Sequence, residues 1–163
     1  VAVPYNMFVW THINVGKVIS EGIDASLLAS YHFDSKQTLS LSGNYTYNKC
    51  ENTTTKTSEY YRNQLAYMPV HSGSASLSYE NPLVNFSVHA TGMSMRWANN
   101  EHYDGCDIPG YLEAGLSMYK TIDIEGKLTL CGDIMNILNK QYSIIYMYPM
   151  PGRSFTLSAT YSF

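Results

Sequence analysis

The sequence predicts an all-β fold, an antiparallel up-and-down meander of about eight strands belonging to a transmembrane β-barrel. Three observations predict it: hydrophobicity alternates with a period of two, charged residues are scarce, and short turns alternate with long polar connections. Only 14% of the 163 residues are charged, whereas 15 are tyrosine. Soluble domains carry about a quarter of their residues as charged side chains, mostly on the surface.

Charge and length exclude several classes of protein. The net charge of −3 and the pI near 5.9 provide no basic face for phosphates, so nucleic acid is not an expected partner. No apolar run reaches the length of a membrane-spanning helix. The first residues carry no signal-peptide pattern, and we expect any leader to lie upstream or to have been removed.

The period of two recurs in every long segment. One parity is apolar or aromatic and the other is Ser, Thr, Asn or acidic, with Leu28 as an exception. The alternating segments are GIDASLLASYHF (22–33), LSLSGNYTY (39–47), VNFSVHATG (84–92), DIEGKLTLCGDI (123–134) and FTLSATYSF (155–163). This pattern predicts strands with one apolar face and one polar face.

Turn residues divide these strands. We expect tight turns at 33–36, 80–83 and around 120–123, and a first reversal near 14–17, where Asp, Asn, Pro or Gly occur. Longer polar connections are expected at 49–61, 98–110 and 139–152. In a meander this alternation places all short turns at one end and all long loops at the other.

The polar parity favours a membrane barrel over a soluble sandwich. It is built from Ser, Thr and Asn rather than Lys and Glu, so the apolar parity is expected to contact lipid. Lipid offers no backbone hydrogen bonds, so the sheet must close laterally. Aromatic residues near the strand ends are expected at the headgroup level, among them Phe33, Tyr79, Tyr119, Tyr161 and Phe163.

The strand residues expected to face the barrel interior also indicate the size of the barrel. They carry many small hydroxyls, which suit a wide interior filled by something else: Ser26, Ser30, Ser40, Ser42, Ser76, Ser78, Ser87, Ser158 and Ser162. The alternative is a complete eight-stranded outer-membrane barrel, either structural or a lipid acyltransferase or deacylase. The segment HSGS (71–74) supplies His and Ser for such an enzyme, but neighbouring strand residues point to opposite faces.

Two further alternatives stay open. A secreted soluble β-domain would explain the glycosylation sequons at Asn44, Asn52 and Asn85. Cys50 and Cys106 lie in polar stretches and form either a disulfide or two unpaired thiols. We expect Cys131, within a strand pattern, to be a small buried residue.

Three segments resemble TonB-dependent outer-membrane receptors. NILNKQYSIIYMYPMPGRSFTLSATYSF (136–163) is similar to their C-terminal end, with an N-L-hydrophobic-x-K-x-Y strand end, a P-G-R loop and a last strand closing on Phe. NVGKVISEGIDAS (14–26) resembles their N-x-G-x-x-x-x-x-G-x-E/D strand pair, with Asp24 where Glu is commoner, and YYRNQLAYMPVHSGSASLSYE (60–80) resembles their P-x-H segment. The YPMPGR loop resembles Bacteroides-type members, whereas Cys50 and Cys106 are not family features.

The resemblance implies that residues 1–163 are the C-terminal segment, the last eight strands of a 22-stranded transmembrane barrel, with the plug and earlier strands absent. It implies uptake across the bacterial outer membrane of a large scarce nutrient such as ferric siderophore, haem or cobalamin. The implied partners are outer-membrane lipid, the rest of the receptor with its plug, TonB, the nutrient chelate and the barrel-assembly machinery. No catalytic residue, metal site or cofactor is expected.

Loop aromatics are the candidate ligand contacts, because tyrosine combines a flat face with a hydroxyl at little entropic cost. The candidates are Tyr60, Tyr61, His102, Tyr103, Tyr146 and Tyr148. The alternative for Tyr146 and Tyr148 is an upper aromatic girdle. For EHYDGCD (101–107) a metal cluster is conceivable, but the spacing does not match a calcium loop, which favours a solvated loop.

Five further residues are expected to have structural or assembly roles. Arg153 follows the P-G turn and is expected to hold the final loop, as are Arg96 and Trp97 at the top of another strand. By resemblance, Tyr161 and Phe163 serve barrel assembly as well as anchoring in the membrane.

Overall fold

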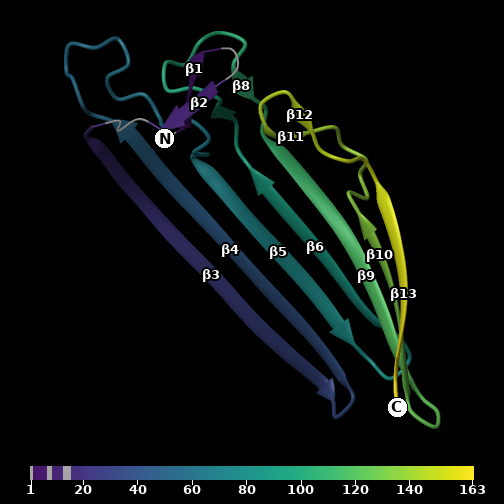
Figure 1. The fold of residues 1–163 in the computed structure, drawn as a ribbon. Coiled ribbons are helices and arrows are strands. Elements are labelled where there is room, and N and C mark those ends of the chain that lie inside the picture. The colour runs from purple at the N-terminus through teal and green to yellow at the C-terminus, as the bar shows by residue number, and fades with distance from the viewer. Residues whose placement is uncertain (1, 7–8, 13–15) are drawn as a thin grey trace.

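The computed structural model describes residues 2–6, 9–12 and 16–163, with side chains from residue 16 onward. Seven strands form one antiparallel sheet in the order β13-β10-β9-β6-β5-β4-β3 (Figure 1). They are β3 (Val18–Asp34), β4 (Gln37–Asn52), β5 (His71–Glu80), β6 (Asn85–Met93), β9 (Tyr111–Asp123), β10 (Lys127–Met135) and β13 (Ser154–Ser162). Among the described residues no helix is long and apolar enough to cross a membrane.

The remaining strands form three small two-stranded sheets. They pair β1 (Ala2–Asn6) with β2 (Val9–His12), β7 (Arg96–Trp97) with β8 (Asp107–Ile108), and β11 (Ser143–Ile145) with β12 (Tyr148–Pro149). The β1–β2 hairpin was not predicted. The first reversal expected near 14–17 overlaps residues 13–15, which lie outside the described part of the chain.

The connections confirm the predicted meander. Turns at 35–36, 81–84 and 124–126 lie at one end of the sheet, and loops at 53–70, 94–110 and 136–153 lie at the other (Figure 1). Two expected boundaries were wrong. The turn expected around 120–123 falls at 124–126, because Asp123 still pairs with Lys127, and β4 continues through Cys50 and Glu51, so the loop expected from 49 starts at 53.

The strand register confirms the two-faced pattern. On one face an apolar row crosses the sheet through Leu41, Leu77, Val88, Leu116, Ile134 and Phe155, each paired with the next. On the other face Ser42 pairs with Ser76, and hydroxyls bond one another between Ser78 and Ser87 (3.1 Å). The apolar face has no second layer over it in the described structure, and Leu157 is 89% exposed. Leu28, the exception to the alternation, lies on the polar face, where it pairs with Ser42.

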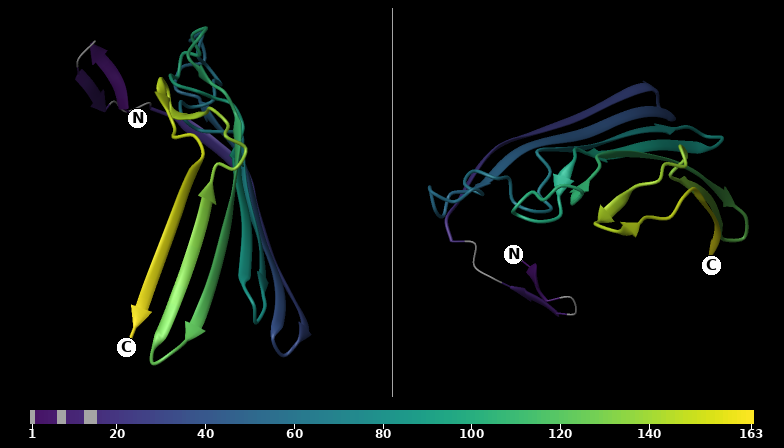
Figure 2. Two further views of the ribbon diagram at one scale, coloured as in Figure 1. Left: turned by 90° about the vertical axis from the view of Figure 1, so that its right-hand side faces the viewer. Right: turned by 90° about the horizontal axis from the view of Figure 1, so that it is seen from above.

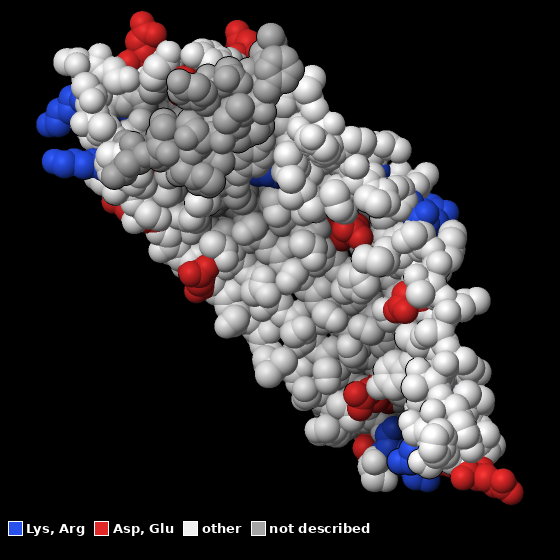
Figure 3. All heavy atoms as spheres, in the orientation of Figure 1, with Lys and Arg blue, Asp and Glu red and all other residues white. Residues whose placement is uncertain are grey.

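The polar face is the concave one. Seen from above, the sheet curves in an arc with β7–β8 and β11–β12 on its inner side (Figure 2, right). Tyr142 of the final loop contacts Tyr111 and Glu113, which share the polar parity of β9. Over the middle of the sheet, charged side chains are few and far apart (Figure 3).

Two strand residues lie differently from their prediction. Tyr119 was expected in the lipid-facing aromatic girdle, but it pairs with Asn85 and Cys131 and lies on the polar face. In β9 the even-numbered residues lie on the apolar face, so Lys120 lies there instead of Tyr119. Cys131 is partly exposed on the polar face and is not the small buried residue expected.

The sheet is open among the described residues. β3 and β13 form its two edges and do not pair with one another. This contradicts the alternative of a complete eight-stranded barrel, whose first and last strands would be joined. Strand edges facing lipid would leave backbone groups without hydrogen-bond partners.

Candidate functional site

Burial concentrates at the end of the sheet that carries the long loops. From residue 16 onward, the buried residues are Cys50, Glu51, Leu65, Arg96, Asn100, Ile108 and Asn136. All belong to the three long loops, to the short strands within them, or to the end of β4. We call this packed region, residues 48–70, 94–113 and 136–153, the mouth.

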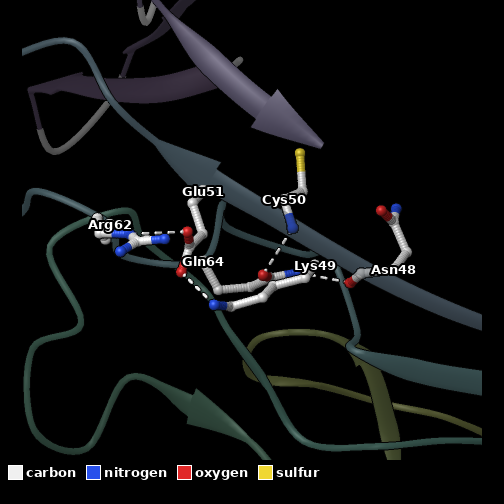
Figure 4. Close-up of polar contacts among 6 residues, drawn as sticks. All are labelled: Asn48, Lys49, Cys50, Glu51, Arg62 and Gln64. Atoms are coloured by element: carbon white, nitrogen blue, oxygen red, sulfur yellow. Dashed lines mark hydrogen bonds and ion pairs between the residues drawn. The ribbon is translucent and has the colours of Figure 1, made fainter. Parts of the chain in front are cut away.

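A carboxylate anchors the first loop. Glu51 accepts from Lys49 Nζ at 2.8 Å and from Arg62 Nε at 3.1 Å (Figure 4). The hydrogen bond from Lys49 lowers the pKa of Glu51 below its ordinary value, with a further contribution from Arg62, although burial opposes the shift. Arg62 has a left-handed backbone conformation, with φ 68°.

Gln64 joins the same loop to β4. Its Oε1 accepts from the Cys50 backbone N–H at 2.8 Å, and its Nε2 donates to the Asn48 carbonyl at 3.2 Å (Figure 4). The thiol of Cys50 points away from these groups (Figure 4). Cys50, Cys106 and Cys131 are all unpaired, so the structure contains no disulfide between Cys50 and Cys106.

His102 connects the first and second loops. Its ring stacks on Trp97 with the centroids 4.6 Å apart and an interplanar angle of 11°. Its Nε2 lies 2.7 Å from the Gln64 carbonyl and donates to it. His102 also has a left-handed backbone, with φ 58°. His102, a predicted ligand contact, is therefore fixed within the mouth by stacking on Trp97 and by its hydrogen bond.

Tyr60 and Tyr103 are brought together from different loops. The interaction with the Tyr103 side chain is the main cause of a raised pKa of Tyr60. Tyr103 is 56% exposed, so this pair presents aromatic surface outward. Tyr61 follows in the same turn, where its backbone N–H donates to the Ser58 carbonyl at 3.1 Å.

The final loop supplies the other two candidates. Tyr146 donates from its hydroxyl to the Gly105 carbonyl at 2.8 Å, which joins the third loop to the second. Tyr148 lies in β12 and is 70% exposed. The structure therefore separates the two: Tyr146 bonds across the mouth and Tyr148 projects from it.

Arg96 is the buried cation of the mouth, only 3% exposed. Its Nη2 donates to the carbonyls of Ser143 (2.9 Å) and Ile144 (2.7 Å), and the guanidinium lies 6.0 Å from the centroid of the Tyr111 ring. Burial lowers the pKa of Arg96, and the interaction with Tyr111 partly opposes this. Arg96 thus fixes the final loop over the concave face.

Tyr142 packs beside it. Its ring stacks on Tyr111 with centroids 4.3 Å apart, and its hydroxyl donates to Glu113 Oε2 at 2.6 Å. Burial, followed by the bond to the Glu113 carboxylate, raises the pKa of Tyr142 to about 12. Sequence reasoning missed this group. The available signals were the Tyr that ends the NILNKQY motif and an acid on the polar parity of β9.

Asn136 begins the same motif and is 2% exposed. Its Nδ2 donates to the carbonyls of Lys140 (2.9 Å) and Pro151 (3.3 Å), and its Oδ1 accepts from the Lys140 N–H (2.9 Å). Arg153 donates from its backbone to Asn139 Oδ1 at 2.9 Å and from Nη2 to the Ile137 carbonyl at 2.6 Å. Asn136, which was not predicted as a site residue, closes the base of the final loop.

Tyr161 and Phe163 lie at the opposite end of the sheet. Tyr161 pairs with Leu128 on the apolar face, and its ring centroid lies 6.3 Å from that of Phe163. The sequence-predicted residues thus divide into a group at the mouth and a pair at the end with the short turns.

The fold and the mouth together define a section of β-barrel wall with an apolar outer face, a hydroxyl-rich inner face and three loops packed over one end. The family model described as "TonB dependent receptor-like, beta-barrel" matches residues 1–137. The chain belongs to this family. No curated protein matches it.

Solved structures show the same fold. BauA, the ferric preacinetobactin receptor of Acinetobacter baumannii, superposes with a TM-score of 0.66 at 16% identity, over 90% of this chain and 27% of BauA. The siderophore receptor PiuA of Acinetobacter baumannii superposes with a TM-score of 0.75 at 20% identity, over 97% of this chain and 23% of PiuA. The chain therefore spans about a quarter of the length of these receptors.

Proposed function

We propose that residues 1–163 form the C-terminal section of a 22-stranded barrel in a TonB-energised receptor, which takes up a nutrient chelate across the bacterial outer membrane. The observation that carries this proposal is the uncovered apolar face of an open sheet whose loops gather aromatic side chains at one end. Family membership supports it. The proposed role of this section is wall and mouth, without catalysis.

The open edges support the proposed domain organisation. β3 and β13 each need a neighbouring strand, which earlier strands of the same receptor would provide. The plug, which would fill the concave side, and the segment that contacts TonB belong to the rest of the proposed receptor. Tyr161 and Phe163, at the end with the short turns, are proposed to be read by the barrel-assembly machinery.

For the cargo we propose a ferric siderophore, with haem and cobalamin as the alternatives. Two structural neighbours are described as a ferric preacinetobactin receptor and a siderophore receptor, which supports this choice. Tyr60 and Tyr103 are the proposed first contacts, because their side chains interact across two loops and the Tyr103 ring is exposed. Tyr61, His102, Tyr146 and Tyr148 are proposed to line the same approach.

The proposal is tested with the full-length receptor and a panel of probes: ferric catecholate, ferric hydroxamate, haem and cyanocobalamin. We expect one ferric chelate to quench the intrinsic fluorescence with saturable binding. The double variant Tyr60→Ala, Tyr103→Ala should lower its affinity about tenfold or more, as for aromatic contacts at the centre of an interface.

Tyr31→Leu is the matched control, because Tyr31 is an exposed aromatic on the apolar face, far from the mouth in β3. Its affinity should equal that of the parent. Saturable binding of haem or cyanocobalamin alone would replace the siderophore with that cargo. Binding of none of the probes, together with recovery of the protein outside the outer membrane, would refute the proposed function.

A further inference from the structure

Lys120 is an isolated cation on the apolar face. It lies in β9 opposite Leu130, and the flanking rows on this face hold Met118 and Gly132 on one side and Ile122 and Leu128 on the other. No ion pair among the described residues involves Lys120; those present join Lys49 and Arg62 to Glu51 at the mouth. Lys120 is partly buried, and these flanking rows contain no other charged residue.

The height of Lys120 corresponds to a membrane interface. The row on the mouth side of it contains Tyr79, Phe86 and Met118, and the row on the turn side contains Tyr161. Rings of aromatic residues mark the headgroup level of transmembrane barrels, and long cationic side chains reach the headgroups from such positions. Lys120 thus lies within the aromatic belt at the end of the sheet with the short turns.

An apolar groove begins at this lysine. It has a volume of about 420 Å³ and is lined by Lys120 with Phe86, Met118, Leu130, Gly132 and Leu157. Gly132 forms its floor, since a Cβ there would stand 3.3 Å from Leu157 Cδ2. The groove spans β6, β9, β10 and β13, so its walls come from paired strands.

We propose that this groove is a binding site for one phospholipid of the inner leaflet of the outer membrane. The Lys120 ammonium binds the headgroup phosphate, and one acyl chain lies along Gly132 between Met118 and Leu157. The inference rests on the proposed function, because the short turns of outer-membrane barrels face the periplasm and the inner leaflet therefore surrounds this end.

The charge of Lys120 and the shape of the groove favour a phospholipid as the occupant. A lone cation without an acidic neighbour on its face complements a phosphodiester, and an apolar channel leading toward the bilayer centre complements an acyl chain. A soluble anion would use the lysine but not the groove. A docked protein strand would need unpaired backbone groups, and all the strands that line the groove, apart from the outer edge of β13, are paired on both sides.

The test uses the detergent-extracted, delipidated full-length receptor, with dioleoyl phosphatidylglycerol titrated and bound lipid counted by native mass spectrometry. Lys120→Met should weaken the tightest lipid-binding step about fivefold, the value of one surface lysine toward anionic lipid. Gly132→Leu keeps the charge but fills the groove, and should weaken the same step. Excess inorganic phosphate should not compete.

The matched control is Lys127→Met. Lys127 is at the same end of the sheet, but it pairs with Asp123 and Ser162 on the polar face. Its removal should leave lipid binding unchanged, and heat-modifiable migration in SDS should show that every variant is folded. Equal losses for Lys127→Met and Lys120→Met, unaltered binding by Gly132→Leu, or competition by phosphate would each overturn the inference. If the parent binds its chelate while these variants show no lipid effect, the lipid site fails and the proposed function stands.

Discussion

The hydroxyl of Tyr142 donates a 2.6 Å hydrogen bond to the carboxylate of Glu113, which joins the final loop to the concave face of the sheet. The bond is reinforced by the stacking of Tyr142 on Tyr111 and by the two bonds from Arg96 to the following carbonyls. The position of this loop over the sheet is therefore determined by contacts between segments distant in sequence.

Alkaline pH should release the final loop through Tyr142. The pKa of this hydroxyl is about 12 in the folded protein and about 10 in an unfolded chain. Between these values the undocked state loses its proton and the docked state retains it, so docking is fully stable below about pH 10 and weakens toward pH 12. Hydrogen exchange of residues 136–153, measured from pH 8 upward against intrinsic exchange rates, should show this loss of protection.

Tyr142→Phe tests the same bond at neutral pH. It leaves the Glu113 carboxylate without its donor and should destabilise the docked loop by roughly 1.5–3 kcal/mol. The alkaline step attributed to Tyr142 should vanish in this variant. Tyr146→Phe is the comparison, because its bond to the Gly105 carbonyl is exposed and should contribute less. Equal protection of 136–153 in parent and Tyr142→Phe would contradict the assignment.

A charge on the convex face should prevent stable insertion. Leu41 belongs to the apolar row that crosses the sheet, and Arg at the bilayer centre of a barrel costs about 2–4 kcal/mol. Leu41→Arg in the full receptor should therefore lower its free energy of folding into phospholipid vesicles by that amount. Ser42→Arg, one residue along on the polar face, should have a small effect. The reverse order would show that the apolar side does not contact lipid.

Removing the buried amide of Asn136 should loosen the base of the final loop. Asn136→Ala leaves the Lys140 and Pro151 carbonyls and the Lys140 N–H without partners, at a cost of about 1–3 kcal/mol. Thermal unfolding of the full receptor and proteolysis within 136–153 measure this. Asn139→Ala removes the exposed bond to the Arg153 N–H, and because Asn139 has the same φ of 49° as Asn136, it serves as the milder control. Equal effects would refute a special role for Asn136.

Acid should detach the first loop through Glu51. Its pKa is lowered from 4.5 by the hydrogen bond from Lys49 and by Arg62. The stabilisation is thus complete above about pH 4.5 and is lost as the pH falls through the lower folded value. Lys49 and Arg62 are 44% and 64% exposed, so the effect should stay below about 1 kcal/mol. Exchange at 53–70 in parent and Glu51→Gln should differ at pH 6 and converge as the pH falls below 4.5.

The sheet was predictable because its information is local. A period of two assigns each residue to a face, and the pairing of Leu41 with Leu77 or Ser42 with Ser76 follows from it. Tyr119 shows the limit of reading single residues. An aromatic side chain near a strand end fits either face, and only the alternation of Leu116, Met118 and Ile122 around it reveals that Lys120, and not Tyr119, lies on the apolar side.

The mouth was only partly predictable because its contacts are non-local. Tyr60 and Tyr103 could be proposed as ligand contacts from their type, but no pattern along the chain indicated that they meet. Arg96 finds its acceptors 47 and 48 residues away. The left-handed conformation of Arg62, a residue type that rarely adopts it, also could not be predicted from the sequence.

The unequal strand lengths have a consequence for access to the barrel. β3 has 17 residues and β4 has 16, whereas β13 has 9. A barrel strand crosses a bilayer in about 9–11 residues, so β3 and β4 extend well past the hydrocarbon, where Glu21 pairs with Lys49. On the side of β3 and β4, an incoming molecule would therefore meet a rigid, hydrogen-bonded pair of strands above the membrane. On the side of β13 it would meet only loops, so the two sides of the entrance differ in height.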